Sequence, residues 1–123
     1  MAGEATTSEV WTLVPEWTTV PDAAEALGVE VTRVRQLIRD GAVLATRAPD
    51  DGPLSIPADF VRGGHVLKGL PGVITLLRDA RYDDLEALRW LYTPDDTLPG
   101  TPAQALVENR GTEVKRRAQA QGF

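Results

Sequence analysis

Hydrophobic positions in the first half of the chain recur at three- and four-residue spacing, which is the periodicity of an amphipathic helix. The pattern predicts one helix over residues 21–27 and a second over 31–40. Thr19 stands where a helix-capping hydroxyl would, and Gly28 and Gly41 follow the two helices as terminators that readily adopt the left-handed conformation. A short helix, a turn containing glycine and a second helix are the parts of a helix-turn-helix.

Two shorter apolar runs follow, and their composition is typical of strands. Residues 43–47 and 54–56 flank the sequence APDDGP, whose prolines, aspartates and glycine are typical of a turn. The pair predicts a β-hairpin, and residues 57–61 predict one further helical turn. A hairpin after a helix-turn-helix is the feature that makes such a domain winged.

Beyond Gly63 and Gly64 the pattern becomes helical again. Helices are predicted over 71–80, 83–92, 102–110 and 113–121. At the other end of the chain, residues 1–10 are polar and are expected to be disordered. The segment WTLVPEW (11–17) is too apolar to extend into solvent, so we expect it to pack back onto the body.

The fold class predicted from these elements is mainly α with a small β-hairpin wing. We divide the chain into a flexible acidic segment (1–16), a winged helix-turn-helix (17–62) and a C-terminal helical domain (66–123). Neither half is long enough for a large core of its own, so the two are expected to pack together.

Charged residues are unevenly distributed along the chain, whose net charge is −5. Residues 1–32 hold six carboxylates and no Lys or Arg, whereas residues 33–68 hold six bases and four acids. Residues 69–123 hold seven bases and eight acids. An acidic chain binds nucleic acid less well on average. The positive middle segment is therefore the feature that function has to explain.

The arginines of that segment gather on one helix, which turns by about 100° per residue. Its apolar face, expected to meet the core, consists of Val31, Val34, Leu37 and Ile38. The opposite face consists of Thr32, Arg35, Gln36 and Arg39, with Arg33 on the flank. Arginine and glutamine can form paired hydrogen bonds with guanine and adenine. The ridge predicts recognition of duplex DNA, and a solvated face of an ordinary surface helix is the alternative.

The segment WTTVPDAAEALGVEVTRVRQLIRDGAVLATR, continued by LSIPADFV, resembles the winged helix-turn-helix of excisionase and MerR-type DNA-binding domains. The whole chain resembles small actinobacterial DNA-binding regulators that carry this module and a C-terminal domain of uncertain role. The second half is also similar, more weakly, to antitoxin-type toxin-binding domains, on the segments that contain WLYTP and GTP.

The resemblance implies that the second helix enters the major groove of double-stranded DNA. Thr32, Arg33, Arg35 and Gln36 would lie in the groove, with Thr32, Arg35 and Gln36 at the bases and Arg33 on phosphate. Arg39 and Arg47 would contact the backbone. Glu30 departs from the capping serine common in the family, and Asp50 and Asp51 place negative charge at the wing tip. We therefore expect modest affinity from one copy, with dimerisation or paired sites.

Further basic and hydroxyl residues are secondary candidates. Lys115, Arg116 and Arg117 are either the cationic end of a helix, which its dipole favours, or auxiliary phosphate contacts. Thr6 and Thr7 are candidate phosphorylation sites, because a phosphate of about −2 charge near a DNA-binding face would weaken binding.

Other chemistries find little support in the residues. The chain has no cysteine and one histidine, so we expect no disulfide, no transition-metal site and no cofactor. The pairs Asp83/Asp84 and Asp95/Asp96 are expected to stabilise helix starts and turns rather than to catalyse. No phosphate-binding loop or nucleophile motif is present, so we do not expect an enzyme.

The N-terminal residues lack the apolar core of a signal peptide, and no stretch is long enough to span a membrane, so we expect a cytoplasmic protein. DNA binding would place it in the nucleoid. The predicted function is a transcriptional regulator or nucleoid-associated factor. The alternative is an antitoxin-like module with a vestigial helix-turn-helix, which would bind a protein partner through the C-terminal domain.

Overall fold

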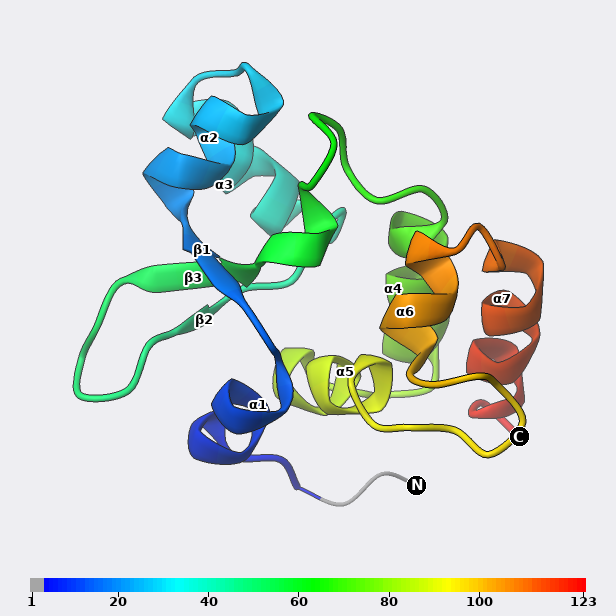
Figure 1. Ribbon diagram of the computed structural model, residues 1–123. Helices are drawn as coiled ribbons and strands as arrows, with labels where there is room; N and C mark the ends of the chain where they lie inside the picture. The colour runs from blue at the N-terminus through cyan, green and yellow to red at the C-terminus, as the bar shows by residue number, and fades with distance from the viewer. Residues whose placement is uncertain (1–3) are drawn as a thin grey trace.

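A computed structural model of the chain describes residues 4–123 (Figure 1). Within this range the elements follow the order α1 (Thr7–Leu13), β1 (Trp17–Thr19), α2 (Val20–Leu27), α3 (Val31–Arg39), β2 (Thr46–Arg47), β3 (Leu54–Pro57), a 3-10 turn (Ala58–Phe60), α4 (Leu70–Asp79), α5 (Asp84–Leu91), α6 (Pro102–Val107) and α7 (Gly111–Ala120). The predicted fold class is confirmed: a winged helix-turn-helix is followed by a domain of helices.

The helix-turn-helix begins and ends where local chemistry requires. The Thr19 hydroxyl accepts a hydrogen bond of 3.3 Å from the Asp22 amide and caps α2. Gly28 ends α2 with a φ of 68°, which glycine adopts without steric cost. Val34 is fully buried on the inner face of α3 and packs into the core behind it. The predicted limits of both helices are confirmed to within one residue.

The sheet is antiparallel, with the strand order β1–β3–β2. Thr18 lies opposite Ile56, and Arg47 lies opposite Leu54. The prediction of a strand over 43–47 is wrong for residues 43–45, because only Thr46 and Arg47 pair with β3, while Val43 and Leu44 are buried in the core before the strand. β1 was not predicted from the sequence, because it is only three residues long and pairs with a strand nearly forty residues further along the chain.

The N-terminal segment is more ordered than expected. The prediction of disorder over 1–10 is wrong for residues 7–10, which belong to α1, whereas residues 1–3 lie outside the described range. The Thr6 hydroxyl caps α1 by accepting from the Glu9 amide, and Val10 is fully buried. α1 packs against α5, as Figure 1 shows below the sheet.

Two tryptophans hold the segment after α1 against the body, as expected for residues 11–17. The rings of Trp11 and Trp17 are stacked at 4.4 Å with an interplanar angle of 7°. The indole N–H of Trp17 also donates to the carbonyl of Trp11 over 3.2 Å. α1 is thereby linked to β1 and to the winged domain.

The four helices of the second half appear where they are predicted, with one shorter end. α6 ends at Val107 rather than near residue 110, because Asn109 adopts a φ of 63° and breaks the helical path. Asp83 caps α5 in a complete capping box with Glu86, which confirms its structural reading. α4 and α7 pack side by side (Figure 1).

Both halves share one apolar core, as expected from their lengths. Buried side chains from α1 to α7 form a single cluster. Phe60 and Tyr92 meet at the junction with ring centroids 6.2 Å apart, and the Tyr92 hydroxyl donates to Asp59 over 3.0 Å. Arg62 lies 3.3 Å from the same carboxylate and 2.9 Å from Glu16.

Gly41 gives a first prediction, because its φ is 74° and a Cβ there would overlap the guanidinium of Arg78. We expect Gly41→Ala to lower the free energy of unfolding by about 1 to 2 kcal/mol, mostly from left-handed strain, with a smaller loss because the flexible end of Arg78 must shift. Gly28→Ala is the matched control, since its φ is 68° and nothing lies within 4 Å; it should cost about 1 kcal/mol. Urea denaturation measures both. Equal losses would show that the contact with Arg78 contributes nothing.

Tyr92 gives a second prediction, on alkaline pH. Burial, together with Asp59, raises the pKa of the Tyr92 hydroxyl above its ordinary value of 10.0. Because the pKa is higher in the folded state than in the unfolded state, this group contributes its full stabilisation below pH 10.0. The stabilisation declines as the pH rises above 10.0, where the tyrosine of the unfolded chain ionises. Tyr92→Phe should therefore remove most of the loss of stability above pH 10.0, measured by urea denaturation at a series of pH values.

Tyr82→Phe is the control for this measurement. Partial burial and then Glu86 raise the pKa of the Tyr82 hydroxyl too, but this side chain is much more accessible to solvent than Tyr92. Its removal should therefore change the alkaline profile less. A larger effect from Tyr82→Phe than from Tyr92→Phe would contradict the assignment.

Candidate nucleic-acid interface

α3 presents its polar ridge to solvent. Five of its side chains are exposed, namely Thr32, Arg33, Arg35, Gln36 and Arg39. The ridge is rigid at its base, because Val34 on the opposite face is 1% exposed and anchors the helix to the core. The structure therefore brings together the five α3 residues predicted from the sequence.

One contact organises the ridge internally. The Arg33 guanidinium donates to Oε1 of Gln36 over 3.1 Å. Because the bond uses the carbonyl oxygen of Gln36, its amide N–H groups remain available as donors. Arg33, which the helical arithmetic places on the flank, thus orients a residue of the ridge itself.

The arginines of α3 and the wing differ from most others in their partners. Ion pairs in the described residues involve Arg62, Arg78, Arg89 and Arg110. Over residues 4–123 no carboxylate lies within 4 Å of the guanidinium groups of Arg33, Arg35, Arg39 or Arg47. These four cations are therefore not neutralised by the protein and can bind an external anion.

The wing carries charge of both signs. Arg47 is exposed at its base, in the strand that pairs with β3. The hairpin loop closes with a hydrogen bond of 2.9 Å from the Ala48 amide to the Pro53 carbonyl. At its tip Asp50 and Asp51 have φ angles of 61° and 58°, and both are exposed. The wing can attract an anion at its base and repel one at its tip.

Glu30 adds a further carboxylate at the start of α3. It occupies the capping position, but its side chain makes no capping hydrogen bond and is exposed. A negative charge at a helix N-terminus is favourable for the helix itself. It also opposes binding of an anion at that end, so the positive end of the ridge is the one that carries Arg35 and Arg39.

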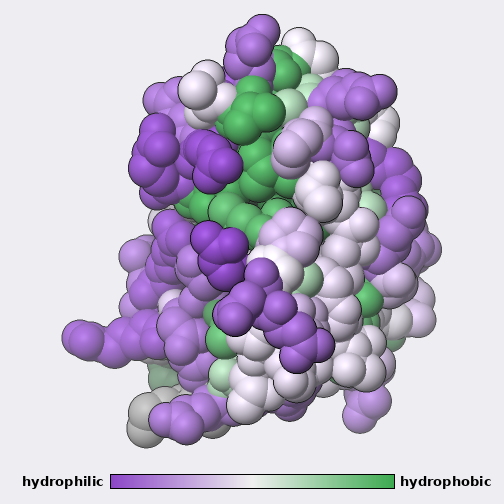
Figure 2. Space-filling model, turned by 90° about the vertical axis from the view of Figure 1, so that its left-hand side faces the viewer, coloured by the Kyte–Doolittle hydropathy of each residue, from purple (hydrophilic) through white to green (hydrophobic). Residues whose placement is uncertain are grey.

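Figure 2 shows the side of the molecule that carries the wing. Hydrophilic residues cover most of this face, and a hydrophobic patch lies in its upper half (Figure 2). Half-buried apolar residues of the domain include Leu27, Val31, Leu37 and Ile38, and Val29 is 39% exposed. The domain thus combines cations, hydrogen-bond donors and apolar groups.

The second basic cluster is divided by the structure. Lys115 and Arg116 are exposed and have no carboxylate within 4 Å among the described residues. Arg117 instead donates to the hydroxyl and carbonyl of Thr97, at 2.7 and 3.1 Å, and to the carbonyl of Glu113. Arg117 therefore joins α7 to the 95–97 turn. Sequence reasoning missed this role, because Thr97 lies twenty residues away.

Asp95 of that turn also has a structural role. The Thr97 hydroxyl and amide both donate to Oδ1 of Asp95, and these bonds hold the pKa of the Asp95 carboxyl below its ordinary value. A search of residues 4–123 finds no group of three His, Cys, Asp or Glu side chains placed to hold a metal ion. No helix in that range is long and apolar enough to cross a bilayer.

Both halves of the chain match family models named for the same protein. Residues 9–61 match a family model described as "DNA-binding protein Rv2175c, wHTH domain", and residues 67–122 match "Rv2175c C-terminal domain of unknown function". The first match begins within α1, upstream of the predicted boundary at residue 17.

A curated relative and a solved structure agree with these matches. The DNA-binding protein Rv2175c of Mycobacterium tuberculosis (strain ATCC 25618 / H37Rv) is 40% identical over 117 residues, which span 85% of this chain and 79% of the relative. A structure described as "NMR structure of Rv2175c" has a TM-score of 0.79 at 38% identity, covering 88% of this chain and 82% of that chain. The resemblance to actinobacterial winged helix-turn-helix proteins is confirmed.

Proposed function

The chain belongs to the family of the DNA-binding protein Rv2175c, and from this premise we propose that it binds double-stranded DNA through its winged helix-turn-helix. The observation that carries the proposal is the set of guanidinium groups on α3 and β2 that have no carboxylate partner in the described chain. Phosphates release bound counterions when such cations approach, and this release drives binding. Elsewhere four arginines are neutralised within the protein.

The roles follow from the position of each side chain on α3. Thr32, Arg35 and Gln36 lie on the solvent-facing ridge and are assigned to base edges or to positioning against them. Arg33, Arg39 and Arg47 are assigned to phosphates, and Arg33 additionally holds Gln36 through the bond of 3.1 Å. Arginine and glutamine both have side chains that can form two hydrogen bonds with a purine in the major groove.

Three exposed carboxylates limit the affinity of a single copy. Glu30 is exposed at the start of α3, and Asp50 and Asp51 are exposed at the tip of the wing. Their negative charge repels phosphate. We assign the protein to paired half-sites occupied by two copies, which is how helix-turn-helix proteins commonly gain affinity. Sequence-dependent binding of this kind is typical of a transcriptional regulator or nucleoid-associated factor. We also assign Arg116 to an auxiliary phosphate contact.

Fluorescence anisotropy on duplex DNA across a salt titration tests the proposal. Wild type should bind with a steep dependence of log affinity on log salt. Arg39→Ala should lower that slope by about 0.9, because one phosphate contact is lost. Arg35→Ala/Arg39→Ala should weaken binding by about tenfold or more. Sedimentation of the same complexes reports whether two copies bind.

Arg110→Ala is the matched control, since it removes the same charge from a guanidinium held near Glu108 and Glu113. It should leave affinity and slope almost unchanged. Equal losses in all variants would mean that net charge alone matters. No binding by wild type at low salt would refute the proposal and favour a protein-binding module.

We also propose that phosphorylation of Thr6 or Thr7 weakens DNA binding. Thr6 is exposed at the cap of α1, and a phosphate there can still accept from the Glu9 amide. Trp11 lies five residues further along α1, a rise of about 7.5 Å. It lines a cavity with Ala48 and Pro53 of the wing. A phosphate on Thr6 would therefore add negative charge to the helix that borders the wing.

Thr6→Asp/Thr7→Asp tests this regulation against Thr6→Asn/Thr7→Asn. Aspartate and asparagine cap helices about equally well, so α1 is retained in both variants and only the charge differs. The aspartate variant should bind DNA more weakly at low salt, with the difference closing as salt rises, and the asparagine variant should match wild type. Equal affinities of all three proteins in the anisotropy assay would contradict the proposal.

A further inference from the structure

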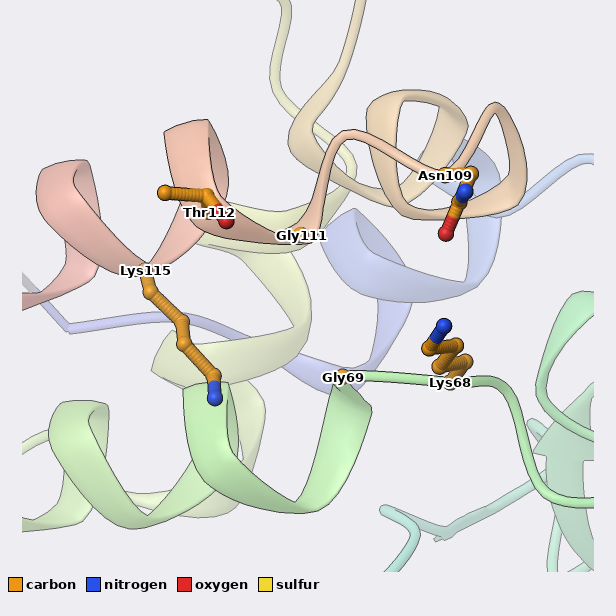
Figure 3. Close-up of a pocket in the computed structure, with 6 residues that line it drawn as sticks. All are labelled: Lys68, Gly69, Asn109, Gly111, Thr112 and Lys115. Carbon is orange, nitrogen blue, oxygen red and sulfur yellow. The ribbon is translucent and has the colours of Figure 1, made fainter.

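The C-terminal domain contains a cavity of about 460 Å³ at the junction of α4 and α7. It is lined by Lys68, Gly69, Asn109, Gly111, Thr112 and Lys115 (Figure 3). The volume falls within the range of small-molecule sites. None of these residues belongs to the winged helix-turn-helix, so the cavity is separate from the proposed DNA interface.

The lining of the cavity is cationic. Lys68 and Lys115 are both exposed, and over residues 4–123 neither has a carboxylate within 4 Å. The nearest acidic residues in sequence, Glu108 and Glu113, lie 3.7 and 3.8 Å from the Arg110 guanidinium and do not line the cavity. Two lysines therefore face one space without a neutralising acid.

Glycines allow close packing beside this cavity. A Cβ built on Gly69 would lie 3.2 Å from Cδ2 of Leu106 and 3.8 Å from the Cα of Gly111, so the start of α4 packs against the segment before α7 without a side chain between them. A Cβ on Gly72 would lie 3.0 Å from Cε and 3.3 Å from Nζ of Lys115, so the lysine lies across α4 at a position without a side chain. The position of Lys115 across α4 therefore depends on the absence of a side chain at Gly72.

Figure 3 shows how the polar groups are arranged. Lys68 points toward Asn109, and Lys115 extends from α7 toward α4 on the other side of Gly69 (Figure 3). The two ammonium groups thus stand on either side of the glycine centre. No aromatic or large apolar residue lines the cavity, so it has no platform for a base or another ring.

We propose that this cavity binds a small anion with at least two phosphoryl groups, held between Lys68 and Lys115. Two separated cations match a ligand with two linked anionic groups better than a ligand with a single anionic group. Diphosphate is the smallest ligand of this class. Asn109 and the Thr112 hydroxyl can donate the remaining hydrogen bonds. The proposal assigns Lys115 to this cavity rather than to the DNA backbone, and it does not depend on the proposed function of α3.

Amide chemical shifts of the full ¹⁵N-labelled chain, titrated with sodium pyrophosphate, test the proposal. Sodium chloride holds the ionic strength constant. Saturable shifts should appear at Gly69, Gly111 and Thr112. Lys68→Gln and Lys115→Gln should each weaken binding by about fivefold, the upper limit for an exposed ion pair, and the double variant should lose it. Both side chains are exposed, so the fold is expected to persist, and thermal denaturation checks this.

Two control variants separate the cavity from general charge. Arg116→Gln removes an equal charge from the neighbouring residue of α7, which does not line the cavity, and should bind pyrophosphate like wild type. Arg35→Ala/Arg39→Ala should also bind it normally. An equal loss in Arg116→Gln, or shifts centred on α3, would overturn the proposal, as would the absence of saturation.

Duplex DNA supplies the last comparison. The proposal expects pyrophosphate to remain bound when DNA is added, and Lys115→Gln to leave the salt slope of DNA binding unchanged. Displacement of pyrophosphate together with a reduced slope would assign Lys68 and Lys115 to the DNA backbone and refute a small-anion site. Loss of DNA binding alone would affect the proposal for α3 and not this one.

Discussion

Phe60 and Tyr92 meet where the winged helix-turn-helix packs against the C-terminal helices, and the rest of the structure depends on this junction. Each half is about sixty residues or shorter, a size at which a chain alone buries a smaller fraction of its surface than a larger domain and is only marginally stable. The buried side chains of both halves instead form one cluster. The Tyr92 hydroxyl satisfies Asp59 at the edge of this cluster, so the junction is closed by a hydrogen bond as well as by apolar contact.

Arginines with partners within the protein hold the C-terminal helices and the N-terminal segment together. Arg78 of α4 lies over Gly41, directly after α3, and pairs with Asp84 at 3.0 Å. Arg89 of α5 donates to the carbonyl of Glu4 over 2.8 Å and lies 3.4 Å from Glu9. Arg78 therefore joins α4 to α5, and Arg89 joins α5 to the N-terminal segment. These arginines have partners within the protein, whereas no described carboxylate pairs with the arginines on α3.

Elements specified by local chemistry were predictable from the sequence. Thr19, Gly28 and Thr101 mark helix ends through bonds or backbone angles that involve only a few neighbouring residues, and the structure has each helix there. The polar ridge of α3 was predictable for the same reason, since helical periodicity alone separates its two faces. Thr6 is also a local cap, but the short polar segment around it obscured α1.

Features that need distant partners were not predictable. β1 exists because Trp17–Thr19 pair with Ser55–Pro57, and three residues carry no strand pattern of their own. The cavity brings together Lys68 and Lys115, which lie far apart in sequence, so neither residue signals the other. Arg117 looked like a free cation for the same reason, because its partner Thr97 lies on a different loop. Long-range packing decides these cases, and single-sequence patterns do not contain it.

At the wing tip the backbone conformation does not depend on the negative charge of the side chains. Asp50 and Asp51 both have backbone angles in the left-handed region. Glycine adopts this region readily, and among the other residues Asn and Asp adopt it most easily. Exchanging Asp for Asn there replaces one oxygen with an NH₂ group and preserves the turn. Evolution can therefore change the attraction of the wing for a polyanion in single-residue steps, independently of the core, so related proteins with one backbone can differ widely in how long they stay on their target.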